Sequence, residues 1–102
     1  MYEYKCQICN TYLKTPFGGI AIGAHIKGLG KPHNGPDIIE NMICLCPNHH
    51  EQFDDFGFYI DSQTYEIKGL ENFEGKKINL NKKHSIDREF LEYHYKEYLK
   101  NN

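Results

Sequence analysis

The sequence predicts a small α+β domain, and three observations support this class. The chain has 102 residues, of which 39% are apolar, which is enough for one modest hydrophobic core. Short apolar runs predict strands, and two segments with helical spacing predict helices. Two pairs of metal-binding side chains, each separated by two residues, predict a bound metal that would stabilise so small a fold.

The first half of the chain alternates short strand-like runs with irregular segments. Pro16 and a following Gly-Gly pair interrupt any regular pattern over residues 11–19, and Gly and Pro dominate residues 27–37. Asp37 is placed to cap a short helical turn. The sequence thus predicts strands over residues 2–5, 20–26 and 43–45, with a helical turn over 38–41.

The second half predicts two helices around a hairpin. Pro47 suits the first position of a helix that Gly57 would end. Ser85 is a candidate cap for the last helix, with Asp87 favourable in its first turn. The predicted elements are a helix over residues 47–56, a hairpin over 58–67, an edge strand near 77–80 and a helix over 86–100.

Composition indicates the cellular compartment and the classes of partner to expect. The sequence has no signal peptide, long apolar run or lipidation motif, so we expect a cytoplasmic protein without a membrane partner. The net charge of −2 does not favour a nucleic-acid binder, although bound cations and clustered lysines would offset it locally. We expect one domain over residues 1–102, with the metal-binding core in 1–57 and an added hairpin and helix in 58–102.

Two pairs of side chains have the spacing of a tetrahedral zinc site: Cys6 with Cys9, and Cys46 with His49. Cys44 competes with His49, because on a strand it faces the same side as Cys46. A buried free thiol is the other interpretation of Cys44. A redox role for the first pair lacks the strand-then-helix context that such motifs have. We predict a structural zinc at the two pairs, and the choice between Cys44 and His49 stays open.

A second cation site is predicted on the far side of the same helix. His49 and His50 are adjacent, so on a helix their side chains point about 100° apart. If His49 faces the zinc, His50 faces away from it, and Asp54, four residues later, shares that face. Such a pair can bind a divalent cation and leave positions open for water and a phosphate oxygen. The alternatives are an exposed helix histidine and an ordinary surface carboxylate.

A resemblance to the HNH endonucleases is carried by the segments GAHIKGLGKPHNGPD and ENMICLCPNHHEQFD. The sequence is most similar to the HNH modules of modification-dependent restriction endonucleases, in which a separate SRA domain reads methylated bases. The resemblance implies a small zinc-stapled ββα-metal finger, here with an added β-hairpin and C-terminal helix.

The resemblance also implies roles for single residues. His25 would be the general base, Asn41 would order the connecting loop, and His50 would bind the catalytic metal. Asp54 lies where many members have a further ligand.

One position departs from the family pattern. Ala24 precedes the base, where members often have an Asp or His that binds the metal, so a loop side chain such as His33 or Asp37 would have to compensate. Lys27, Lys31 and His33 are the expected nucleic-acid contacts.

The sequence therefore predicts a metal-dependent endonuclease that hydrolyses DNA phosphodiester bonds. It would use a histidine base and one Mg²⁺, Mn²⁺ or Ni²⁺, beside a structural Zn²⁺. So short a chain has little surface for reading bases, so specificity would come from a domain on another or a longer chain. Double-strand cutting by one active site favours a homodimer. A non-catalytic, zinc-stabilised DNA-binding or interaction module is the alternative, and RNA as the target also stays open.

Overall fold

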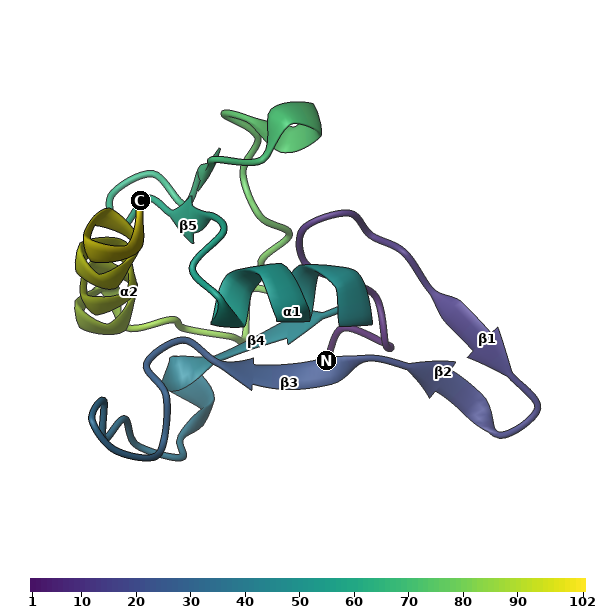
Figure 1. Cartoon of the computed structure of the whole chain (residues 1–102). Coiled ribbons are helices and arrows are strands. Elements are labelled where there is room, and N and C mark those ends of the chain that lie inside the picture. Colours follow the sequence, from purple (N-terminus) through teal and green to yellow (C-terminus); the bar gives the residue numbers. More distant parts are fainter.

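The computed structural model describes all 102 residues and shows a two-stranded sheet crossed by one helix (Figure 1). Strands β3 (Ile22–His25) and β4 (Met42–Leu45) pair antiparallel, and α1 (Pro47–Asp54) packs against both. The remaining elements are β1 (Leu13–Thr15), β2 (Gly18–Ile20), β5 (Tyr59–Ile60), β6 (Ile67–Lys68), the 3-10 turns η1 (Ile39–Asn41) and η2 (Glu71–Phe73), and α2 (Arg88–Asn101). The predicted α+β class is confirmed.

The β3–β4–α1 unit follows from local sequence signals. Ala24 and Ile43 face each other across the strand pair and are both buried, as alternating apolar residues on one sheet face should be. Pro47 is the first residue of α1, as predicted. The helix ends earlier than expected, because Phe56 already takes a left-handed conformation with φ of 58° before Gly57 is reached.

The prediction of a strand over residues 2–5 was wrong. Residues 2–5 form a turn, because Glu3 and Tyr4 both have left-handed φ angles of 52° and 63°. The backbone N–H of Lys5 donates to the carbonyl of Tyr2 at 2.9 Å and closes this turn.

The segment expected to be irregular contains a hairpin. β1 and β2 pair antiparallel with Thr15 opposite Gly18, and the pair projects away from the rest of the fold (Figure 1). The hydroxyl of Thr15 closes the turn, accepting from the N–H of Phe17 and donating to the carbonyl of Gly18. A Cβ at Gly19 would lie 2.7 Å from side-chain atoms of Tyr4 and Tyr12, so glycine is there to allow close packing.

The predicted hairpin after α1 is confirmed in a shorter form, with Ile60 opposite Ile67. The prediction of an edge strand near residues 77–80 was wrong, since that stretch makes only one isolated bridge, from Lys77 to Glu66.

The capping predictions were also wrong at two places. Asp87, and not Ser85, caps α2 by accepting from the N–H of Glu89, and η1 has no side-chain cap from Asp37.

Helix α2 covers the end of the core opposite the β1–β2 hairpin (Figure 1). Its buried residues are Phe90, Leu91 and His94. The His94 ring stacks on Phe53 of α1, with centroids 3.8 Å apart and planes 4° apart, and Nε2 lies 2.9 Å from the carbonyl of Phe53. Neither helix is both long and apolar enough to cross a bilayer.

The buried His94 predicts that stability falls in mild acid. Burial lowers the pKa of its imidazole to about 4, against about 6.5 in an unfolded chain. Between these values the unfolded chain binds a proton that the folded chain does not, so the free energy of unfolding must decrease as pH falls from about 6.5 to about 4. Denaturant titrations over this range should show a contribution from His94 of up to about 3 kcal/mol.

The matched variant is His94→Gln, which keeps a side-chain N–H donor at this position and removes the titratable imidazole. Protonation of other groups affects both proteins alike, so the difference between their pH curves isolates His94. The wild-type curve should be the steeper one. Parallel curves would contradict this account of His94.

Candidate active site and metal centre

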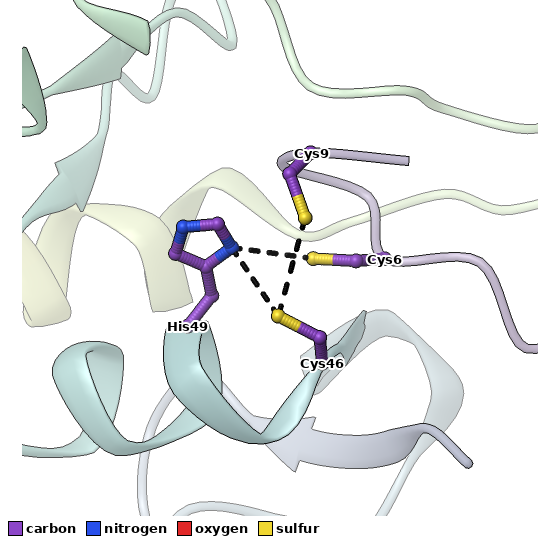
Figure 2. A group of neighbouring side chains, drawn as sticks. All are labelled: Cys6, Cys9, Cys46 and His49. Carbon is purple, nitrogen blue, oxygen red and sulfur yellow. Dashed lines mark hydrogen bonds between the residues drawn. The ribbon is translucent and has the colours of Figure 1, made fainter. Parts of the chain in front are cut away.

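Four side chains converge at the N-terminal end of α1: Cys6, Cys9, Cys46 and His49 (Figure 2). Their ligand atoms all lie within 4.8 Å of one another. His49 Nδ1 is 3.6 Å from Cys6 Sγ and 3.5 Å from Cys46 Sγ, and the sulfurs of Cys9 and Cys46 are 4.0 Å apart. Tetrahedral zinc requires edges of about 3.8 Å between sulfurs and about 3.6 Å from sulfur to nitrogen. The cluster therefore fits zinc in both donor set and size.

The N-terminal knuckle is held in place by a short turn and one buried side chain. Asn10 adopts a left-handed φ of 62° and donates its N–H to the carbonyl of Cys6, which turns the chain back after Cys9. Gln7 is fully buried, and its side chain accepts from the N–H of Cys44 and donates to the carbonyl of Asn79. Gln7 thus ties the knuckle to β4 and to the segment before α2.

The pKa values of the side chains in the cluster favour the binding of a cation. Burial raises the pKa of the Cys6 thiol to about 12, so a thiolate there needs compensating positive charge. Burial also lowers the pKa of His49, which keeps its imidazole neutral and able to bind a metal. Zinc would supply the positive charge that holds the sulfurs as thiolates.

Cys44 lies outside the cluster, and His49 supplies the fourth ligand atom. The thiol of Cys44 is half-buried, whereas the sequence predicted a buried one. Its neighbours explain the difference, because Gly23 stands opposite Cys44 across the strand pair and covers little of it.

Removal of the metal should unfold the chain, because the free energy of zinc binding in such sites is about 10–16 kcal/mol and exceeds the stability of most small domains. Cys46→Ser should bind less than one zinc per chain and melt far below the wild type. Cys44→Ser is the matched control and should bind one zinc and melt as the wild type does. Zinc content by atomic absorption and thermal melting by circular dichroism test both. Equal zinc content in the two variants would contradict the assignment.

On the other side of α1, a cavity of about 410 Å³ brings together two of the residues predicted for catalysis, His25 and His50, whereas Asn41 does not line it. His25 at the end of β3 lines this cavity with His50 and Asp54 of α1. The two elements meet because α1 crosses the strand pair, so residues distant in sequence come to face one space. The cavity is open to solvent on one side, so a phosphate group could enter it.

His25 and His50, which line this cavity, are each paired with an aspartate. His50 Nε2 is 2.9 Å from Asp54 Oδ2, as expected for a histidine and an aspartate four residues apart on one helix. Burial raises the pKa of Asp54, and the neighbouring His50 acts in the opposite direction. His25 Nε2 is 2.8 Å from Oδ1 of Asp37, which the sequence had placed at a helix cap or at the metal.

Asn41 closes the loop that follows His25. Its side chain is fully buried and makes three hydrogen bonds across the loop. Oδ1 accepts from the N–H of Lys27 at 2.8 Å, and Nδ2 donates to the carbonyls of Lys27 and Pro36, both at 2.9 Å. An amide is the side chain that can donate and accept in this way. Asn41 therefore fixes both ends of the loop that carries Asp37.

The three side chains predicted to contact nucleic acid differ in their surroundings. Lys31 is exposed. Lys27 Nζ lies 4.6 Å from the ring centroid of Tyr93 in α2, and His33 Nδ1 lies 2.6 Å from the hydroxyl of the same tyrosine. Glu97 accepts from that hydroxyl at 3.3 Å. The loop is therefore docked on α2, a contact that no local sequence signal could reveal.

Sequence reasoning also missed residues that complete the cavity wall. Phe56, Tyr93 and His94 also line the cavity, as an aromatic wall. The spacing along α2 indicated only that Tyr93 or His94 faces the core. Nothing in the sequence indicated that this part of the core opens onto the candidate site.

Comparison with known proteins identifies the class to which this site belongs. The HNH endonuclease family matches residues 6–61, which hold the zinc cluster, His25, Asn41, His50 and Asp54. Because this match covers more than half of the chain, the chain belongs to the HNH endonuclease family.

Among solved structures, the fold matches a modification-dependent TagI restriction endonuclease with a TM-score of 0.86 and 33% sequence identity. The match covers 94% of this chain and 34% of that protein, so this chain spans about a third of its length. No curated protein matches the sequence.

Proposed function

We propose that this HNH endonuclease hydrolyses DNA phosphodiester bonds at the cavity between β3 and α1. The observation that carries the proposal is the meeting of His25, His50 and Asp54 at one cavity. A histidine base opposite a histidine–aspartate pair supplies the two groups that phosphodiester hydrolysis requires, a proton acceptor and a cation ligand set. Residues 1–102 would act as one nuclease domain.

His25 is the general base in this proposal. Its Nε2–H donates to the carboxylate of Asp37, which places the proton on Nε2 and the lone pair on Nδ1. Nδ1 then takes the proton of the attacking water. The same carboxylate stabilises the imidazolium that results, so Asp37 acts as a positioning residue.

His50 and Asp54 bind the catalytic cation, Mg²⁺, Mn²⁺ or Ni²⁺. Their donor atoms are adjacent in the structure, and both residues line the cavity. When bound, this ion stabilises negative charge on the phosphate and on the leaving oxygen. Ala24 is buried in the core and offers no ligand, so His50 and Asp54 would be the two protein groups that hold the ion.

Specificity is proposed to come from outside this domain. The matched restriction endonuclease is described as modification-dependent and is about three times as long as the aligned segment. We infer by analogy that a partner domain, on another or a longer chain, chooses the DNA, and that two copies of the nuclease domain cut the two strands. Lys31 on the exposed loop would contribute to backbone contact.

His25→Ala should lower kcat for nicking of supercoiled plasmid by about 10²–10⁴-fold, because it removes the proton acceptor. The zinc-loaded protein should be assayed with Mg²⁺, Mn²⁺ and Ni²⁺ in turn, with Cys44→Ser as a folded control that retains activity. Equal nicking by wild type and His25→Ala, or no nicking by either with any ion, contradicts the proposal.

Asp37→Asn should lower kcat by about 10- to 100-fold, the usual effect of losing a carboxylate that orients a functional histidine. KM for plasmid should not change, because Asp37 is not proposed to touch DNA. Glu71→Gln, which removes an exposed carboxylate in η2, is the matched control. A rise in KM with unchanged kcat would assign Asp37 to DNA binding instead.

A further inference from the structure

The cavity that holds the proposed hydrolytic group is also lined by an aromatic wall. Phe56, which follows α1, and Tyr93 and His94 of α2 form this wall. The cavity volume of about 410 Å³ lies within the range of about 300–1,000 Å³ typical of pockets for small organic ligands. This volume is larger than a water molecule and one phosphate group need.

One ring of this wall has neither a parallel ring stacked on it nor a cation over it. Lys27 lies over the ring of Tyr93, and His94 is stacked on Phe53 with nearly parallel planes. Phe56 meets its two neighbouring histidine rings at interplanar angles of 60° and 40°, and neither is stacked on it. Phe56 is half-buried and is the aromatic side chain of the wall that lacks both kinds of partner, which makes it the candidate for stacking with a ligand ring.

Phe56 has a backbone conformation that its residue type disfavours. Its φ of 58° is a left-handed conformation that bulky side chains rarely adopt. Glycine is the usual residue just after a helix end, and here the glycine is one position later, at Gly57. The strain indicates that the ring's position is set by its surroundings and not by the turn.

We infer that Phe56 is a stacking platform for the nucleobase next to the scissile phosphate. The inference rests on the proposed function for the position of that phosphate, beside His25 and His50. Stacking of this kind accepts any base, because every base has a π face. It requires a base that has left its own stack, which is least costly in single-stranded or unpaired DNA. The chain would therefore bind single-stranded or locally opened DNA more tightly than a paired duplex.

Two probes of equal charge test this inference: hexathymidylate and an abasic hexamer with the same backbone. Binding is measured by fluorescence anisotropy with the full, zinc-loaded chain in the His25→Ala background, so that no cleavage occurs. Phe56→Leu keeps an apolar side chain at the same strained position, and Phe56→Tyr keeps the ring. Thermal melting of each variant checks that it is folded.

Phe56→Leu should weaken binding of hexathymidylate by about 5- to 150-fold and leave binding of the abasic hexamer unchanged. Phe56→Tyr should bind both probes as the parent does. Equal affinity of the Phe56→Leu variant and the parent for hexathymidylate overturns the inference, as does an equal loss for both probes. If the wild type shows base-dependent binding through Phe56 but cuts no DNA, the hydrolytic proposal fails and the stacking site stands.

Discussion

The Cys₃His cluster at the start of α1 is the constraint on which the rest of the site depends. A helix of eight residues is marginal by itself, so tertiary contacts must fix both its position and its rotation. His49 Nδ1, within 3.6 Å of two sulfurs, fixes the rotation. Because successive helical residues point about 100° apart, this rotation turns His50 toward the cavity. The cluster thus orients the face of the helix that carries His50 and Asp54.

A second constraint fixes the strand side of the cavity. The carbonyl of Asn41 accepts from the N–H of Ile26, and its side chain makes three bonds across the loop between Lys27 and Pro36. A buried amide with all these partners is costly to disturb, because each bond lost would leave a polar group unsatisfied. The loop therefore presents Asp37 to His25 in one geometry. The two sides of the cavity are thus held separately, one by the Cys₃His cluster and the other by the hydrogen bonds of Asn41.

The sequence revealed the parts of this arrangement that depend on local spacing. The two ligand pairs, the divergence of His49 from His50 and the pairing of His50 with Asp54 follow from residue intervals alone. The β1–β2 hairpin was missed because Gly18 and Gly19 indicated a break, whereas Gly19 provides close packing against tyrosines. The partner of Asp37 was also missed, since its contact with His25 exists only after the loop has closed.

Helix α2 is the part of the site that local patterns could least predict. It lies beyond the matched segment of residues 6–61, yet Tyr93 and His94 line the cavity and Tyr93 bonds to His33 of the loop. The aromatic wall is therefore shared between two regions of the chain, because Phe56 follows α1 whereas Tyr93 and His94 belong to α2. Substitution of Tyr93 should reshape this wall without moving His25 or His50, because Asn41 and the Cys₃His cluster position those two residues from elsewhere in the fold. In the proposed function, the hydrolytic group and this part of the substrate space can therefore vary separately.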